Sequence, residues 1–539
     1  MKFADSKNIA GKLAMLFQDP SNFASKVISR LEGNLIDKHT KQFMRHNQKV
    51  WKGWANNAGS RLVLFDYYPV AETEIARSYL LNILAQKRKA TIASIGLTRQ
   101  HRNRKWRKIY QSFNVNRHVS PTPNTEQKHR SLDILRKIAP GLKTKKDIFE
   151  LRIDDVWIGI DIYEEYLMRF TEPTIHLGDP RLSDLIKEGI ETFVFWRDFF
   201  ETHDVRAVSI SQPLRMHNII LKTAGQLFHI PLYGAHARSI SYWPKAGEFS
   251  HTFTEYRNQF KSFSTEKQKW GLEWAKKQIS RRLEGEVGVD MPYSTKSAFA
   301  SSGNTGPVLR KTDHIKVLIC PHEFYDSPNC YGGLLFMDFY EWLVYLGELS
   351  QKTEYDWYIK THRDLLPGAK EILERIIVKY PRFEMIPPDT SHYQLAAEGI
   401  NFVLTCYGTV GHEYPLLGVQ VINAGDNPHM AYDFNWNPKT LSEYEHMLLN
   451  LNSLKKEIKL DELYEFYFVH YGTSAVDDLV FRSYTQMLSE LTEQQRVHTD
   501  IFSYFLNQLT QDRHLEIIRN FSDFIDSGEQ FYSIYTELK

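Results

Sequence analysis

The chain has 539 residues, of which 42% are hydrophobic and 13% are aromatic. One hydrophobic core rarely organises a chain of this length, and this composition excludes overall disorder, so we expect two folded domains and an added segment. The 67 basic and 65 acidic residues leave a net charge of only +2. Overall charge therefore argues against a nucleic-acid-binding protein.

Cysteine use and hydropathy indicate a cytoplasmic protein. Cys320, Cys330 and Cys406 lie far apart without CxxC spacing, so they predict neither a disulfide framework nor a zinc site. No apolar run reaches the roughly 18 residues of a membrane-spanning helix. The stretch MKFADSKNIAGKLAMLF lacks the apolar core and cleavage site of a signal peptide.

Two basic segments stand out in the first part of the chain. Residues 1–55 predict a polar helical extension that ends in KHTKQFMRHNQKVWKGW, and residues 98–118 read TRQHRNRKWRKIYQSFNVNRH. Such segments suit the phosphates of a membrane surface, of a nucleic acid or of a phosphorylated acceptor. The alternative is a solvated basic helix. Because the low net charge argues against a nucleic acid, a membrane surface is the external partner that we expect for these segments.

Residues 56–285 predict a first Rossmann-like domain, because strand and helix patterns alternate along them. The strand signals are RLVLFDYYPV, TIASIGL, VWIGIDIY, RAVSIS and IPLYGA. Ligands bind beyond the carboxyl ends of the strands in open α/β sheets. Polar residues expected at such ends are Glu72, Asp161 and His236.

Residues 286–313 are charged and then rich in Ser, Gly and Pro, which predicts a linker. Residues 314–450 predict a second Rossmann-like domain, and residues 451–539 a helical segment that packs across both domains. The strand ends of the second domain share one edge of its sheet. That edge collects His322, Lys360, His362, Arg363 and a glycine-containing turn.

The turn belongs to residues 402–425, which read as strand, tight loop, helix and strand. The loop would offer backbone N–H groups and one hydroxyl to a phosphate at a helix amino terminus. It consists of Gly408, Thr409, Val410 and Gly411. Glu413 can accept hydrogen bonds from two vicinal hydroxyls of a ribose. The alternative is a buried unit whose carboxylate only complements the helix dipole.

The cationic strand ends suit a reaction in which phosphate departs. Lys360, His362 and Arg363 can neutralise the charge that builds on the leaving group, so no metal or other cofactor is expected. Paired carboxylates that would hold Mg²⁺ are absent from these predicted strand ends. For His362 the alternative is a helix-capping or core-edge histidine.

Three segments carry a resemblance to a known family: HEFYDSPNCYGGLLFMDFYEWL, YIKTHRD and LTCYGTVGHEYPLLGVQVINAGDNPHMAYDF. They resemble the C-terminal half of bacterial surface-polysaccharide glycosyltransferases of GT-B architecture, in particular the capsule-synthesis family that includes Kdo transferases. The resemblance covers residues 316–448 well and the first half weakly. It implies two Rossmann-like domains facing a cleft, with the donor in the second domain and the acceptor on the first.

The resemblance also implies roles for single residues. His362 and Thr409 would contact phosphate, Glu413 would contact ribose, and Asn427 and His429 would join the donor site. The family's His-Pro pair is His362-Arg363 here, so the resemblance does not fix the donor, which is CMP-Kdo or another nucleotide-activated sugar.

Three functions stay open at this point. The first is transfer of a sugar from a nucleotide donor to a growing capsule, lipopolysaccharide or lipid-linked acceptor. The others are a nucleotide-sugar 2-epimerase or hydrolase and a non-catalytic glycan-binding scaffold. An inverting transferase needs a general base from the first domain, for which Asp161 is the first candidate and His236 and Glu72 follow. A retaining enzyme needs none.

Overall fold

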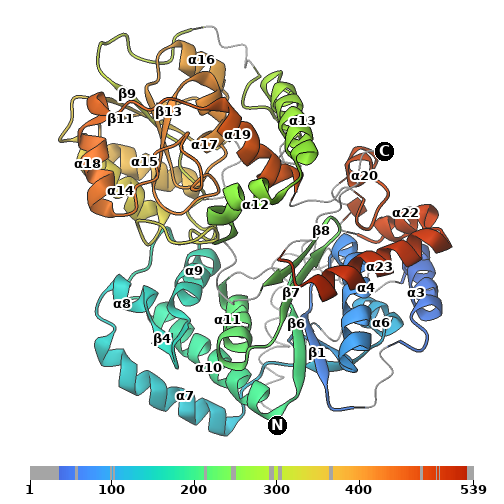
Figure 1. Ribbon diagram of the computed structural model, residues 1–539. Coiled ribbons are helices and arrows are strands. Elements are labelled where there is room, and N and C mark those ends of the chain that lie inside the picture. The colour runs from blue at the N-terminus through green and yellow to red at the C-terminus, as the bar shows by residue number, and fades with distance from the viewer. Residues whose placement is uncertain are drawn as a thin grey trace, which may run out of the picture.

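The computed structural model describes residues 36–54, 59–97, 100, 103–211, 215–243, 251–289, 296–300, 306–362, 368–473, 478–492, 495–496 and 498–530. The predictions for residues 1–35, for parts of the linker and for Arg363 lie outside these ranges. The described residues form two α/β lobes, each built on its own sheet (Figure 1).

The first lobe contains a six-stranded sheet of order β3-β2-β1-β6-β7-β8. Neighbouring strands are parallel except for β8, which is antiparallel to β7. The strands are β1 (Leu62–Asp66), β2 (Thr91–Ile95), β3 (Val115–Val119), β6 (Val205–Ser209), β7 (Leu232–His236) and β8 (Ser239–Trp243). Every residue of β1 is buried, as expected for a central strand covered by helices on both faces.

The helices of the first lobe are α3 (Lys38–Val50), α4 (Ala71–Arg88), α6 (Arg104–Ser112), α7 (Thr125–Ile138), α8 (Lys145–Phe149), α9 (Gly159–Phe170), α10 (Pro180–Thr202) and α11 (Asn218–Lys222). The predicted strand VWIGIDIY is wrong. Only a two-stranded hairpin, β4 (Arg152–Ile153) with β5 (Val156–Trp157), precedes α9. Ile162, Tyr163, Tyr166 and Leu167 are buried at helical spacing, so the helix extends upstream through Asp161.

The second lobe contains a five-stranded parallel sheet of order β11-β10-β9-β12-β13. Its strands are β9 (Lys316–Ile319), β10 (Asp356–Lys360), β11 (Phe383–Ile386), β12 (Phe402–Thr405) and β13 (Gln420–Asn423). Its helices are α14 (Phe339–Ser350), α15 (Ala369–Lys379), α16 (His392–Ala397), α17 (Val410–Glu413) and α18 (Leu441–Leu449). Both sheets have the doubly wound order of Rossmann-like domains, which confirms the predicted GT-B-like fold class.

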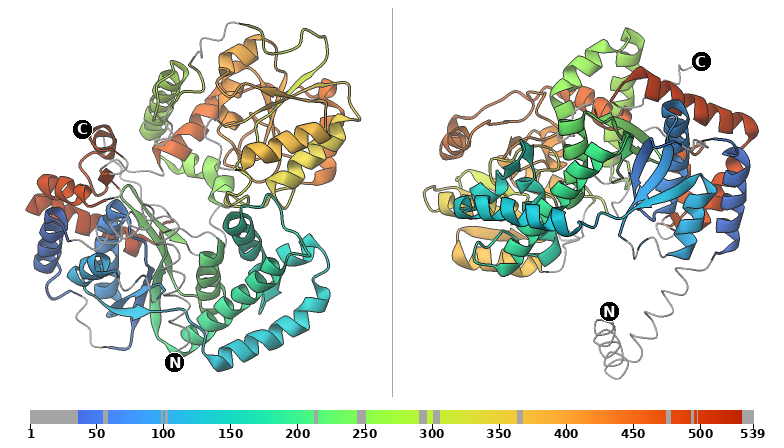
Figure 2. Two further views of the ribbon diagram at one scale, coloured as in Figure 1. Left: turned by 180° about the vertical axis from the view of Figure 1, so that it is seen from behind. Right: turned by 90° about the horizontal axis from the view of Figure 1, so that it is seen from below.

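The chain crosses between the lobes more than once. Helices α12 (Tyr256–Ser262) and α13 (Thr265–Leu283) share an apolar cluster with α19 (Leu460–Tyr467), and so pack on the second lobe although they precede residue 285. Helices α20 (Tyr484–Glu490), α22 (Asp500–Gln508) and α23 (Gln511–Ser527) return to the first lobe, as both views in Figure 2 show. In the described part of the chain, no helix is long and apolar enough to cross a membrane.

Helix α9 holds the two lobes together through buried polar contacts. The hydroxyl of Tyr163 donates to Oδ2 of Asp338, the residue that caps α14, at 2.6 Å. Oε1 of Glu164 accepts from the backbone N–H of Asn329 at 2.9 Å. Lys145 also forms an ion pair of 2.8 Å with Glu341. These contacts fix the loop before α14 against the first lobe.

We expect Tyr163→Phe to lower the free energy of unfolding by about 1–3 kcal/mol, because buried Asp338 loses the hydroxyl donor. Tyr166→Phe is the matched control, because the hydroxyl of Tyr166 donates to Asp179 within the first lobe. In this variant Asp179 still accepts a hydrogen bond from Arg181. Chemical denaturation of both variants measures the difference. If both variants lose the same free energy of unfolding, the bond from Tyr163 to Asp338 does not stabilise the contact between the lobes.

Candidate functional site

A cavity of about 620 Å³ opens at the carboxyl edge of the second sheet. Residues that follow β9, β10 and β12 line it, together with the end of α13 and the π-helical turn Phe468–Gly472. The strand order reverses between β9 and β12, so the cavity lies at the switch point where open α/β sheets bind ligands. Its volume is within the roughly 300–1,000 Å³ of small-molecule sites.

Most of the residues predicted to hold the donor line this cavity. They are His322, Lys360, His362, Gly408, Thr409, Val410, Glu413 and His429. No described residue of the first lobe is among the lining residues.

The turn after β12 presents two backbone donors. The N–H of Gly408 donates to the Thr405 hydroxyl at 3.2 Å, and that of Gly411 donates to the carbonyl of Gly408 at 2.9 Å. Within the described residues, no acceptor is recorded for the N–H groups of Thr409 and Val410. The short α17 passes into a 3₁₀ turn at Pro415, so its dipole is small and any attraction for an anion rests on these N–H groups.

Gly411 and Asn427 do not line the cavity, in contrast to the prediction. A Cβ atom at Gly411 would lie 2.4 Å from the His429 ring, so glycine is needed there for close packing. The amide of Asn427 donates to the Gly425 carbonyl and to Asn437, and its oxygen accepts from the N–H of His429. These two residues shape the loop that carries His429.

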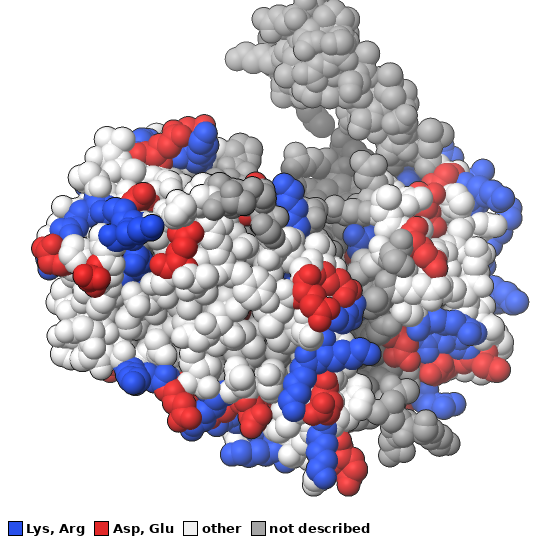
Figure 3. Space-filling view, turned by 90° about the horizontal axis from the view of Figure 1, so that it is seen from above, with Lys and Arg blue, Asp and Glu red and all other residues white. Residues whose placement is uncertain are grey.

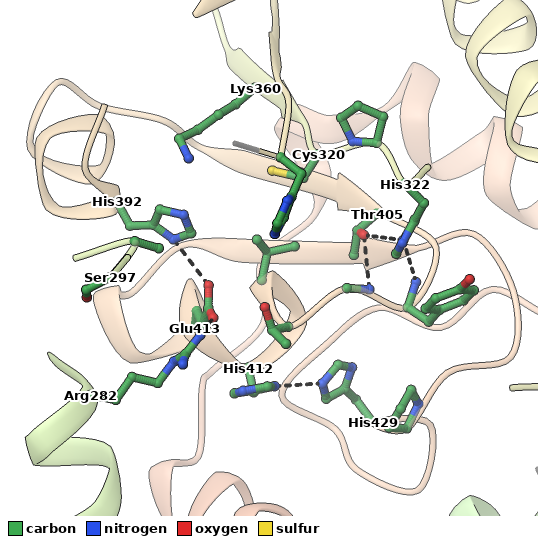
Figure 4. Close-up of a pocket in the computed structure, with 18 of the residues that line it drawn as sticks. Arg282, Ser297, Cys320, His322, Lys360, His392, Thr405, His412, Glu413 and His429 are labelled. Carbon is green, nitrogen blue, oxygen red and sulfur yellow. Dashed lines mark hydrogen bonds and ion pairs between the residues drawn. The ribbon is translucent and has the colours of Figure 1, made fainter. Parts of the chain in front are cut away.

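Glu413 lies in the cavity wall and is 1% exposed. One carboxylate oxygen accepts from the Arg282 guanidinium, and the other lies 3.4 Å from Nδ1 of His392 (Figure 4). Burial raises the pKa of Glu413, but the charges of Arg282, His392 and His412 outweigh this effect and lower the pKa to about 2. The carboxylate is therefore ionised throughout the neutral range. An ionised carboxylate has about four acceptor sites, so both contacts leave capacity for the two hydroxyls of a ribose.

Six histidines line the cavity: His322, His362, His392, His412, His429 and His470. Burial and the charge of His362 lower the pKa of His322 to about 3, and burial and nearby histidines hold the pKa of His429 well below its ordinary value. Nδ1 of His412 lies 3.1 Å from Nε2 of His429 (Figure 4). His322 and His429 thus supply hydrogen bonds and not charge. Apart from the histidines, the positively charged lining residues are Arg282, Lys296 and Lys360, and the negatively charged ones are Glu286, Glu323, Asp326 and Glu413.

Of the predicted first-domain candidates, Asp161 forms a buried ion pair within the lobe and Glu72 lies at the start of a helix. Asp161 is 2% exposed and forms an ion pair of 2.7 Å with Lys222 inside the first lobe, which stabilises the packing of α9 on α11. Burial raises its pKa to about 6, although Lys222 opposes this effect. Glu72 lies in the first turn of α4, where the hydroxyl of Tyr484 approaches it at 3.5 Å. Both residues were expected at the carboxyl ends of strands, and both are helical.

His236 is the remaining candidate, half-buried at the carboxyl end of β7. Its Nε2 lies 3.0 Å from the carbonyl of Ser211, so Nε2 carries the proton and Nδ1 the lone pair. Burial and the charge of Arg77 lower the pKa of His236 from its ordinary value. It lies on the ligand-facing edge of the first sheet and outside the cavity.

Several lining residues were not predicted from the sequence, above all Arg282 and His392. His392 follows β11 and begins α16, so its position after a predicted strand was an available signal. Arg282 had no such signal, because α13 reaches the cavity only through packing on the second lobe. The described residues hold no cluster of His, Cys, Asp and Glu that suits a metal ion.

No protein-family model and no curated protein matches the chain. Solved structures with a distant likeness include KpsC of Thermosulfurimonas dismutans, a beta Kdo 2,4 transferase, at 13% identity and a TM-score of 0.30 over 49% of this chain and 79% of that chain. The UDP-GlcNAc 2-epimerase of Neisseria meningitidis, bound to UDP-GlcNAc, has 12% identity and a TM-score of 0.22 over 76% and 97%. The wall teichoic acid polymerase TagF has 10% identity and a TM-score of 0.20 over 87% and 98%. At these scores, the fold assignment rests on the strand order of the two sheets.

We expect Glu413→Gln to lower the free energy of unfolding by about 3–5 kcal/mol at pH 7, because Arg282 loses its buried partner. The pKa of Glu413 is about 2 in the folded protein against an ordinary value of 4.5, so the ion pair stabilises the fold fully above pH 4.5. That contribution is lost as the pH falls from 4.5 towards 2.

Denaturation of the native protein and of Glu413→Gln from pH 7 to pH 3 checks this expectation. The stability difference should shrink below pH 4.5, while exposed Glu457→Gln, as the control, should stay close to the native protein. A difference that does not change with pH would contradict the ion pair.

Proposed function

We propose that the cavity binds the nucleotide of an activated sugar and that the protein is a glycosyltransferase of GT-B type. It would act in the cytoplasm and move the sugar to a growing cell-surface polysaccharide or a lipid-linked acceptor. One observation carries the proposal: an ionised carboxylate, two backbone donors and a lysine surround one cavity at the switch point of the second sheet.

In this proposal each group has a chemical task. The N–H groups of Thr409 and Val410 and the ammonium of Lys360 bind phosphate, and Glu413 accepts from the ribose hydroxyls. Lys360 ends β10 and is 8% exposed, so its charge acts in a region of low dielectric, where it stabilises a departing phosphate more strongly than in water.

We assign the general base of an inverting transfer to His236. Asp161 and Glu72 are held in contacts within the first lobe, whereas Nδ1 of His236 carries a lone pair at the edge where an acceptor would dock. An acceptor hydroxyl would give its proton to Nδ1 as its oxygen attacks the anomeric carbon, and the nucleotide would leave with the bonding electrons.

A nucleotide-sugar 2-epimerase or hydrolase is the second candidate. Glu323 and Asp326 favour it, because both carboxylates line the cavity and could exchange protons with a bound sugar. The non-catalytic scaffold requires neither these carboxylates nor the ion pair of Glu413.

We expect one or two members of a panel of CMP, CDP, UDP, GDP and dTDP to raise the melting temperature. A ligand that binds only the folded state at a hundred times its Kd stabilises by about 2.7 kcal/mol. Lys360→Met should abolish the shift without breaking the buried pair, and Glu413→Ala should abolish it relative to its own melting temperature. His446→Ala, outside the cavity, is the control. If the nucleotide raises the melting temperature of both cavity variants as it does that of the native protein, the nucleotide does not bind at the assigned site.

We expect the matching nucleotide sugar to release its nucleotide only when a saccharide acceptor is added, since transfer needs a hydroxyl to attack. His236→Ala should lower kcat by about 100-fold or more with little change in nucleotide affinity. Chromatography of the products measures both. Conversion of the sugar without any acceptor would favour the epimerase or hydrolase, and nucleotide binding without any turnover would favour the scaffold.

A further inference from the structure

We propose that the outward face of α3 and α6 docks the protein on an anionic lipid bilayer. The residues of this basic face are all exposed Lys and Arg: Lys38, Lys41, Arg45, Lys49, Lys52, Arg107 and Lys108. The proposal concerns the first lobe and is independent of what the cavity binds.

The two helices carry positive charge without internal compensation. α3 reads KHTKQFMRHNQKV and α6 reads RKWRKIYQS, and neither contains Asp or Glu. Among the described residues, two acidic side chains form ion pairs with these helices, both at the amino-terminal ends. Asp37 lies 3.6 Å from Lys105, and Asp500 lies 3.6 Å from His39. Neither pair involves a residue of the basic face.

The tertiary structure joins two segments that are separate in the sequence. The side chain of Asn47 donates to the Ser112 hydroxyl at 3.1 Å near the ends of the helices, and Lys105 approaches Asp37 near their starts. The helices are therefore parallel and side by side on one core (Figure 1). Because the inward sides of both helices pack on this core, their exposed sides form one continuous surface.

Another face of the molecule lacks such a concentration of positive charge. On the surface in Figure 3, basic side chains mostly lie close to acidic ones. Ion pairs such as Arg169 with Glu188 and Arg206 with Asp204 neutralise much of the exposed charge elsewhere on the first lobe. The basic face keeps its charge available for an external anionic surface.

The packing of the helices favours a flat lipid surface over a nucleic acid. Trp106 and Tyr110, which lie among the basic residues of α6, are 7% and 1% exposed, so neither ring can stack on a base. Helix α3 is flanked by α6 and α22, and a helix held on both sides cannot enter a major groove. Thirteen helical residues extend over about 20 Å, which gives a broad face for many headgroups at once.

Vesicle sedimentation tests the proposal with the full chain and no nucleotide. We expect binding to vesicles of phosphatidylglycerol and phosphatidylcholine, weaker binding at high salt, and little binding to phosphatidylcholine alone. The triple variant Arg45→Glu, Arg107→Glu and Lys108→Glu should bind at least about a hundredfold less, because each basic residue at an anionic surface contributes roughly fivefold.

The matched control changes the net charge equally on the second lobe. It carries Lys370→Glu, Arg375→Glu and Lys379→Glu, all exposed on α15, and should bind vesicles like the native protein. Circular dichroism checks that both triple variants are folded. Equal loss in both variants, or native-like binding by the α3 and α6 variant, would overturn the proposal. Binding of a single-stranded RNA oligonucleotide in place of vesicles would also overturn it.

Discussion

The buried carboxylate of Glu413 is the constraint on which the cavity depends. An unpaired charge in this position would be strongly destabilising, and Arg282 and His392 compensate it. Arg282 belongs to α13, which precedes the second sheet in the chain and packs on α19 through an apolar cluster. The packing of this helix and the ionised state of the carboxylate therefore depend on one another. A substitution in α13 far from the cavity would therefore affect the site by displacing Arg282 from Glu413.

The two lobes share a strand order but use their switch points differently. In the first lobe, Asp66 at the end of β1 accepts from Arg77 at 2.7 Å and from the N–H of Ser211, and Arg77 also pairs with buried Glu74. Side chains of the lobe itself occupy the position where a ligand would bind. In the second lobe the corresponding crevice is open and lined by histidines. Among the described residues, the carboxyl edge of the second sheet therefore carries the cavity, whereas the carboxyl edge of the first sheet presents His236.

Regular alternation made the fold predictable. Continuous apolar runs at β1, β9, β10 and β12 identified buried parallel strands, because a strand covered on both faces carries no polar alternation. The segment VWIGIDIY was wrongly predicted as a strand for the same reason. Its apolar residues suit a buried strand or a buried helix, and only the buried positions of Ile162 and Tyr166 reveal the helical period. The strand ends Lys360 and His322 could be placed because parallel strands share one edge.

By itself, the sequence determined most of the local units: the strands other than VWIGIDIY, the turn at Gly408, and the position of Glu413 in the helix after it. These depend on residues within a few positions of one another. Only the tertiary structure decided that Arg282 reaches Glu413, that Asp161 pairs with Lys222, and that α3 and α6 form one basic face. Each of these contacts joins segments about 60 or more positions apart. Their partners are set by the packing of whole helices, which no local pattern encodes.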